Sequence, residues 1–295
     1  MLWTPENPHI YRFTLETDTD KIESYFALRE VGIDEFDGVK RITLNGEPYV
    51  FNGLLDQGYW SDGMYTAPSD EALIYDIQTM KDLGFNTLRK HIKIEPLRWY
   101  YHCDRLGMIV WQDMPNGGGD YNMIFVTYLT NAFDWFARGV RDNLYGMFKR
   151  QDKEGRAQYY RDLEAMIEQL YNYPSIAVWV PFNEGWGQFE SDHMYDYVKG
   201  LDSTRLADST SGWFAQDKND FDSEHIYFKA IPVEPNERPM FMSECGGYSM
   251  AVEDHYYSKY NVYGYGGRTF RSNSAIFFYC SGWYYSQYGS WDFVF

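Results

Sequence analysis

The chain has 295 residues, and its 43 Asp and Glu against 26 Lys and Arg give a net charge of −17 at pH 7. A protein this acidic repels nucleic acids and anionic membrane surfaces, so neither is an expected partner. Three widely spaced cysteines, no apolar run of 18 residues and no basic start before an apolar stretch argue against a disulfide framework, a structural zinc site, a membrane span and a signal peptide, and leave the compartment open.

Residues 1–37 alternate apolar and polar side chains. This period of two in residues 9–15 and 21–29, with an Asp-rich link between them, predicts an antiparallel hairpin. Two strands do not make a stable domain alone, so we expect either a β-sandwich whose earlier strands precede this chain or a hairpin that packs against the next part of the chain. Asn45-Gly46 then predicts a tight turn between two further strand-like pieces.

From residue 69 onward, helical and strand patterns alternate. Ser69 is a suitable N-cap for a helix that ends at Gly84, and Pro96 opens a second helix that Gly107 closes. Three glycines at 117–119 lack the context of a phosphate-binding motif and predict a loop, and the residues up to 160 are less regular. Further helices are predicted at residues 161–170 and 194–201, and strands at residues 85–88, 108–111, 176–180, 205–209, 225–228 and 239–243.

This alternation determines the predicted fold class. Seven strand candidates lie between residues 49 and 243, and polar and aromatic residues follow them. Parallel βα units of this kind predict an α/β protein with a (β/α)₈ TIM barrel. A doubly wound sheet is the alternative, and it is disfavoured because no Gly-rich phosphate turn follows the first strand.

Two of the predicted strands end in a glutamate. Residues 176–180 lead into Asn183 and Glu184, and residues 239–243 lead into Glu244. A single glutamate after a strand would more often cap a helix or pair with a lysine. In a parallel barrel, however, both would face the same mouth, and glycoside hydrolysis requires two carboxyl groups, one as acid and one as nucleophile or base.

Several segments carry a resemblance to a known family. They are residues 2–8 (LWTPENP), 45–48 (NGEP), 84–89 (GFNTLR), 111–115 (WQDMP), 173–179 (YPS to Trp179), 183–184 (NE) and 238–244 (RP to Glu244). From about residue 1 to 267 the chain thus resembles glycoside hydrolase family 2, the group of β-galactosidases, β-glucuronidases and β-mannosidases.

The resemblance implies a domain division. Residues 1–37 would be the last strands of an immunoglobulin-like β-sandwich, residues 38–267 the TIM-barrel catalytic domain, and residues 268–295 an unassigned, aromatic-rich tail. The tail does not resemble the family's last strand and helix. We therefore expect a barrel that is incomplete at its C-terminal end, and a chain that is a fragment or carries a shifted reading frame.

The resemblance also implies roles for the site residues. Glu184 would be the acid/base and Glu244 the nucleophile. Asn183 is placed to bind a sugar 2-hydroxyl, and Arg89 is placed to hold Glu244 ionised. Substrate contacts are further expected from residues just beyond strand ends, namely His91, Asp113, Trp213, His225 and Tyr227. No HxH or HExxH spacing occurs, so neither a metal nor another cofactor is predicted.

The predicted function is a retaining exo-β-glycosidase that acts on terminal β-linked sugars in the manner of a β-galactosidase. Its expected partner is a small carbohydrate, and the full-length protein could form an oligomer. Two alternatives stay open: a non-catalytic carbohydrate-binding remnant of such an enzyme, and a metal-dependent hydrolase on the same barrel.

Overall fold

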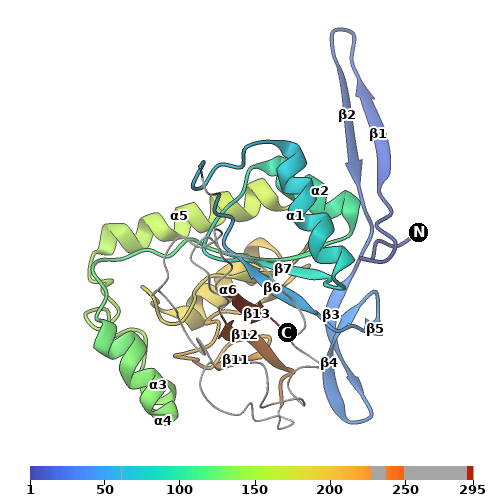
Figure 1. Ribbon diagram of the computed structural model, residues 1–295. Helices are drawn as coiled ribbons and strands as arrows, with labels where there is room; N and C mark the ends of the chain where they lie inside the picture. The colour runs from blue at the N-terminus through green and yellow to red at the C-terminus, as the bar shows by residue number, and fades with distance from the viewer. Residues whose placement is uncertain (61, 227–236, 249–290, 295) are drawn as a thin grey trace, which may run out of the picture.

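The computed structural model in Figure 1 describes residues 1–60, 62–226, 237–248 and 291–294. Helices lie around a central sheet, and a long hairpin extends away from it. None of the described helices is long and apolar enough to cross a membrane. In chain order the elements are β1 (Tyr11–Glu16), β2 (Lys21–Phe26), β3 (Val31–Phe36), β4 (Val39–Leu44), β5 (Glu47–Pro48), β6 (Gly53–Asp56), α1 (Asp70–Asp82), β7 (Thr87–Lys90), α2 (Leu97–Leu106), β8 (Ile109–Asp113), the π-helix η1 (Ile124–Leu129), α3 (Thr130–Ala132), α4 (Asp134–Gly139), α5 (Lys153–Leu170), β9 (Ile176–Val180), α6 (Ser191–Leu201), β10 (Leu206–Ala207), β11 (Asp222–Ile226), β12 (Met240–Tyr248) and β13 (Trp291–Val294).

The N-terminal strands form two small antiparallel sheets. β1 and β2 pair with Tyr11 opposite Phe26, which confirms the predicted hairpin. β3, β4 and β5 make the second sheet, and the predicted Asn45-Gly46 turn joins β4 to β5 with φ values of 57° and 82°. Among the described residues no ladder joins the two sheets, so an immunoglobulin-like sandwich is not confirmed.

The central sheet has the strand order β10-β9-β8-β7-β6-β13-β12-β11 in the described part of the chain. β7 to β12 correspond to six of the seven predicted strands, whereas the first, which was expected to start at residue 49 and to end at Gly53, is replaced by β6, which begins at Gly53. The neighbours among β6 to β12 pair in parallel. We expected no strand from the tail, but β13 runs antiparallel between β12 and β6. Within the described ranges no ladder of hydrogen bonds joins β10 to β11, the two outer strands of this sheet, so a closed barrel is not found there. A backbone hydrogen bond from the Asp220 N–H to the Ala207 carbonyl (3.2 Å) connects the chain before β11 to β10.

The helices begin and end largely where their caps predict. The Ser69 side chain accepts the Ala72 N–H at the start of α1, and Gly107 ends α2 with a φ of 75°. α5 starts at Lys153, where the Asp152 side chain caps it, and not near residue 161 as predicted. The sequence pattern placed the start too late because the first turns face solvent and carry no apolar stripe. η1, α3 and α4 likewise lie in the stretch that was predicted to be irregular.

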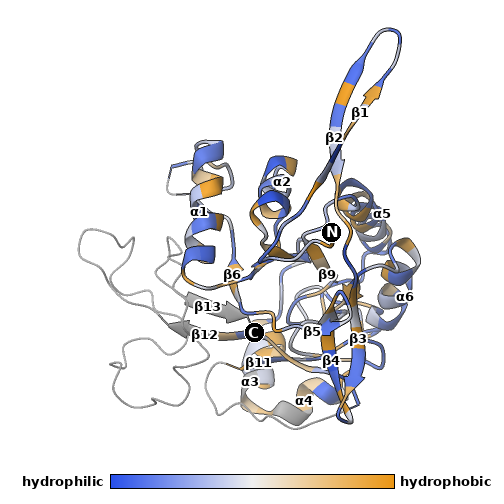
Figure 2. Cartoon of the chain, turned by 90° about the vertical axis from the view of Figure 1, so that its right-hand side faces the viewer, coloured by the Kyte–Doolittle hydropathy of each residue, from blue (hydrophilic) through white to orange (hydrophobic). Residues whose placement is uncertain are grey.

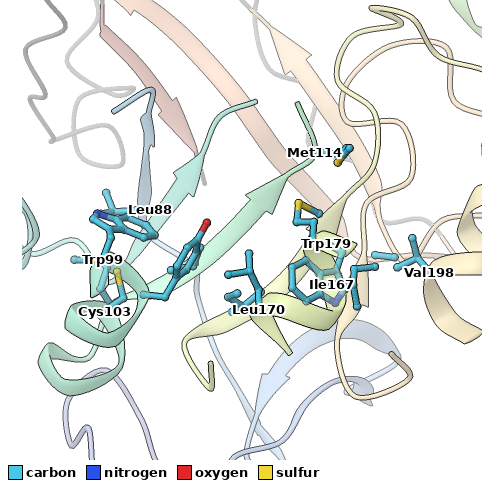
Figure 3. Packing of buried hydrophobic residues seen from close by; sticks show 14 of the residues in the cluster. Leu88, Trp99, Cys103, Met114, Ile167, Leu170, Trp179 and Val198 are labelled. Carbon is cyan, nitrogen blue, oxygen red and sulfur yellow. The ribbon is translucent and has the colours of Figure 1, made fainter. Parts of the chain in front are cut away.

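The core has two parts, one on each face of the sheet. Residues between the strands and the helices form the outer part, and Figure 3 shows Leu88, Trp99 and Trp179 packed there. Inside the sheet's curve Trp111 stacks on Phe241 with ring centroids 4.2 Å apart, and Phe51 and Phe221 pack around them. These aromatic side chains therefore serve as core residues inside the curve of the sheet.

Hydrogen bonds connect the N-terminal segment to the amino-terminal side of the central sheet. Trp3 is buried and donates to the Asp104 carbonyl (2.7 Å), while the Tyr25 hydroxyl donates to the Asp104 carboxylate (2.6 Å). Arg29 donates to the carbonyls of Pro174 (3.0 Å) and Ile176 (2.7 Å) at the start of β9. These contacts lie at the opposite end of β9 from Glu184.

The free energy of unfolding is expected to depend on pH through Asp104. Burial raises the pKa of Asp104 to about 7, although hydrogen bonds from Ser175 and Tyr25 lower it. The folded state therefore holds a proton that the unfolded state releases near pH 4, and this stabilisation is lost as the pH rises from about 4 to 7. We expect Asp104→Asn to remove a slope of up to about 1.4 kcal/mol per pH unit from the unfolding free energy.

Denaturant unfolding of the variant and the parent at pH 5 and pH 7.5 measures this difference. Asp162→Asn on the exposed face of α5 is the control and should keep the parental slope. An Asp104→Asn protein with the parent's pH slope would show that this carboxyl does not bind the proton.

Candidate active site

Glu184 lies in a tight turn that follows β9. Its backbone N–H donates to the Ser211 carbonyl (2.9 Å), and its φ of 53° lies in the left-handed region, which costs a non-glycine residue about 1–3 kcal/mol. Gly185 follows at φ 72°, and a Cβ there would come within 2.4 Å of the Phe214 ring. The turn is thus packed so closely that it holds the Glu184 backbone in a strained conformation.

Glu244 lies on β12, close to Glu184. Its Oε2 is 3.5 Å from Nη1 of Arg89 and 3.7 Å from Nδ1 of His225. One carboxylate oxygen each from Glu184 and Glu244 and one nitrogen of His225 all lie within 4.8 Å of one another, and the three residues are buried. The structure therefore brings the two predicted carboxylates together.

Arg89 connects the groups around these carboxylates. It is fully buried and makes a two-pronged ion pair with Asp113 at 3.0 and 3.1 Å. It also donates to Asn183 Oδ1 (2.8 Å) and to the Ser243 carbonyl (3.3 Å). Burial lowers the pKa of Arg89, but the charges of Asp113 and Glu244 outweigh it and raise the pKa overall. Arg89 is thus a fixed cation that orients protein groups, and Asp113 is its main partner.

His225 lies between the two glutamates, with a fully buried side chain. Its Nε2 is 3.2 Å from Nη1 of Arg89, which can only donate, so Nε2 accepts and the ring proton is on Nδ1. Nδ1 therefore donates to Glu184 Oε1 at 2.9 Å. Burial lowers the pKa of His225 to about 4; Glu244 opposes this shift and Arg89 adds to it. The imidazole is neutral near pH 7.

The remaining predicted contacts have different positions. His91 is half-buried with Nδ1 3.5 Å from Gln57 Nε2, and burial, Arg89 and His225 all lower its pKa. Trp213 is half-buried, with its ring 6.4 Å from that of His225. Tyr227 lies outside the described residues.

Two further residues that contact this site, Trp186 and Ser211, are not among the predicted catalytic and substrate-contact residues. Trp186 donates from its indole N–H to Glu184 Oε2 at 3.2 Å, so each oxygen of this carboxylate has a donor. Ser211 contributes its carbonyl to the Glu184 turn, and its hydroxyl lies 3.1 Å from His225 Nε2. The signal that could have identified Ser211 is the run of polar residues at 208–211 after β10, where a parallel strand ends at the mouth.

A second buried charge cluster lies on the other face of β7. Lys90 follows Arg89 and points toward α2, where its ammonium group lies 2.7 Å from Asp56 and 2.9 Å from Glu95. Lys93 pairs with Glu95 at 2.8 Å. The signal for this cluster was two consecutive cations in a strand, because both faces of a buried strand then need anionic partners.

Glu184, His225 and Glu244 are close enough together to surround a metal ion. Arg89 lies 3.2 Å from His225 and 3.5 Å from Glu244, so a fixed positive charge is built into this side of the cluster. The prediction that the site uses no metal stays a prediction.

The sequence around this site matches a known domain family. Residues 37–234 match the family described as "Glycosyl hydrolases family 2, TIM barrel domain". The chain is 25% identical over 207 residues to a β-galactosidase of Leuconostoc mesenteroides and 28% identical over 210 residues to one of Lactococcus lactis; each match covers 69% of this chain. The chain spans only 18% of the length of each of these relatives.

Solved structures agree with the fold. The β-glucuronidase of Parabacteroides merdae superposes with a TM-score of 0.54 at 20% identity, over 77% of this chain and 26% of that one. A β-galacturonidase of Eisenbergiella tayi bound to galacturonate gives a TM-score of 0.53 at 23% identity, over 72% and 33% of the two chains. At these identities the likeness concerns the fold alone.

Proposed function

This chain belongs to glycoside hydrolase family 2, and on that premise we propose that it is a retaining exo-β-glycosidase with Glu184 as acid/base and Glu244 as nucleophile. The spacing of the two carboxylates is the observation that carries the proposal. Retaining enzymes hold their carboxyl groups about 5–5.5 Å apart, whereas inverting enzymes need about 6.5–9.5 Å to admit a water molecule. Oxygens of Glu184 and Glu244 within 4.8 Å of each other favour retention.

In the first step Glu244 attacks the anomeric carbon while Glu184 gives its proton to the departing glycosidic oxygen, which leaves a covalent glycosyl ester. In the second step Glu184 takes a proton from water, and the water oxygen displaces Glu244. Arg89 favours the charged form of Glu244 before attack. Because Arg89 is also paired with Asp113, it keeps a counter-charge when Glu244 becomes an ester.

Asn183 is suited to recognise the sugar next to the acid. Its Oδ1 accepts from Arg89, which fixes the amide orientation. Its Nδ2 makes no hydrogen bond to any residue that the structure describes, so it can donate to a 2-hydroxyl. Such a contact strengthens as the oxocarbenium-like transition state forms.

We propose a neutral sugar, as in a β-galactoside, as the substrate. Relatives named β-galactosidase support this choice. Arg89, the cation beside Glu244, is already paired with Asp113, which disfavours the carboxylate of a uronic acid as a further partner of this guanidinium. An aryl β-glucuronide that is hydrolysed faster than the aryl β-galactoside would contradict the choice of sugar.

The stereochemistry of the first product tests the mechanism. We expect proton NMR of aryl β-galactoside hydrolysis to show the β-anomer of the free sugar first and the α-anomer only later, as mutarotation proceeds. If the α-anomer forms first, retention is wrong. Galactose binding without turnover would favour the non-catalytic remnant, and loss of turnover with a chelator would favour the metal-dependent hydrolase.

The domain division remains part of the proposal. The family match begins at residue 37, next to the proposed boundary between residues 37 and 38. Phe13, Leu15, Ile22 and Phe26 are 37–56% exposed on one face of the β1–β2 hairpin, and Figure 2 shows hydrophobic stretches on both strands. A β-sandwich that includes residues 1–37 would cover this face. Residues 38–267 would form the barrel domain, and residues 268–295 stay unassigned apart from β13.

A further inference from the structure

Residues 117–150, the insertion between β8 and α5, share a hydrophobic cluster with the loops that carry Trp186 and Phe214. Phe125, Phe148 and Phe214 are its buried centre, and Tyr121 and Trp186 are half-buried members of it. α3 and α4 of this insertion lie on the side of the molecule away from the β1–β2 hairpin (Figure 1). The insertion thus brings aromatic side chains next to Glu184.

Trp186 is held in place by close packing on both sides. A Cβ at Gly187 would lie 1.8 Å from the Gly117 carbonyl oxygen, and both Gly185 and Gly187 have a φ of 72°. The backbone N–H of Trp186 donates to the Asn183 carbonyl at 2.9 Å. The backbone on both sides of Trp186 thus lies close to neighbouring groups, and the indole N–H bond to Glu184 Oε2 (3.2 Å) places the ring against that carboxylate.

Tyr121 forms a corner with this indole. The two ring centroids are 5.0 Å apart and the ring planes meet at 83°, so the rings are nearly perpendicular. The Tyr121 hydroxyl donates to the Gly117 carbonyl at 2.7 Å, which fixes the ring. Two perpendicular, half-buried rings can contact a flat apolar group by stacking and by edge contact together.

We propose that this aromatic corner, Tyr121 and Trp186, binds the leaving group of the substrate and selects leaving groups with a flat apolar face, such as an aryl alcohol or a second sugar ring. The inference rests on the proposed function, because the group that receives the proton of Glu184 must lie beside Glu184. Trp186 touches this carboxylate at Oε2, whereas Glu244 approaches the sugar from β12.

Kinetics of Tyr121→Ala test the corner without removing the indole contact to Glu184. We expect kcat/KM for phenyl β-galactoside to fall about three- to tenfold, the size of one ring contact, and kcat/KM for β-galactosyl fluoride, whose leaving group has no ring, to stay unchanged. Tyr128→Ala is the matched control, since Tyr128 is a tyrosine of the same insertion that is 65% exposed, and it should change neither value. Tyr121→Phe keeps the ring and should lose less than Tyr121→Ala.

Equal losses on both substrates, or none on either, would overturn the proposal. Parallel assays with a β-galactosyl disaccharide identify the leaving group: a loss confined to the phenyl substrate indicates an aryl alcohol, and a loss on both indicates that a second sugar ring also binds there.

Calorimetry separates failure of the corner from failure of the proposed hydrolysis. Phenyl 1-thio-β-galactoside should bind the parent about three- to tenfold more tightly than its methyl analogue, and Tyr121→Ala, which leaves the indole in place, should reduce this preference. If the parent hydrolyses galactosides but binds both analogues equally, the corner is wrong and the function stands. If the parent shows the preference without hydrolysis, the corner stands and the function fails.

Discussion

Glu244→Gln is expected to lower kcat/KM by about 10⁴-fold or more for every β-glycoside, because the nucleophile of the first step is lost. Glu184→Gln should behave differently. Its loss should reach about 10²–10⁴-fold for an alkyl or sugar leaving group, which needs a proton, and should be much smaller for a dinitrophenyl group, which leaves as a stable anion. The dependence on the leaving group therefore distinguishes the two roles.

Azide provides a second measurement of these roles. With Glu184→Ala, azide should attack the glycosyl ester and give a β-glycosyl azide; with Glu244→Ala, it should attack the substrate directly and give the α-anomer. Glu224→Gln is the control, because Glu224 pairs with Arg138 at 3.1 Å near the surface and should keep parental rates. Parental rates in both site variants, or exchanged azide products, would contradict the assignment.

Arg89→Met should have the largest effect on stability. Asp113 and Arg89 are both buried, so the substitution leaves a carboxylate without its counter-charge in the interior. Breaking a buried pair in this way costs about 3–5 kcal/mol of unfolding free energy. Arg89→Lys keeps the charge but cannot make the two-pronged contact with Asp113, so its loss should be smaller.

A double variant isolates the cause of that loss. Adding Asp113→Asn to Arg89→Met removes the unpaired charge and should restore part of the stability, while activity stays low because Asn183 and Glu244 still lack the guanidinium. Arg98→Met breaks the exposed pair with Asp70 and should cost less than about 1 kcal/mol. Denaturant unfolding of these four variants measures the losses; an Arg89→Met protein as stable as Arg98→Met would refute the argument.

Local rules placed much of the fold from the sequence. Ser69 and Gly107 marked helix ends because capping and the left-handed conformation depend on single residues. β9 was placed correctly because all five of its residues are buried. β11 was placed several residues late, since Asp222, Ser223 and Glu224 are polar and only partly buried. β13 pairs with strands that are far away in the chain, which no local pattern reports.

The sequence indicated which residues gather at the candidate site better than it indicated their contacts. Strand-end positions were enough to expect Glu184 and Glu244 in one place. His225 and Asp113 were expected to touch the sugar, and this stays a prediction; what the sequence did not indicate is that their side chains pair with Glu184 and Arg89 respectively. The position of a residue at the carboxyl end of a strand predicts that it lies at the mouth of the sheet. Which side chain it contacts there depends on the neighbouring strands.

The backbone of Glu184 has a consequence for how this sequence came about. At a φ of 53°, glycine or asparagine would be accommodated with less strain, so selection for folding alone would not favour a glutamate at this position. The stability of the folded chain therefore does not explain why a glutamate occupies this position. On the proposed mechanism, the strain is an inherited cost of hydrolysis, and mutational drift in a lineage that no longer needed the reaction would tend to remove this residue early.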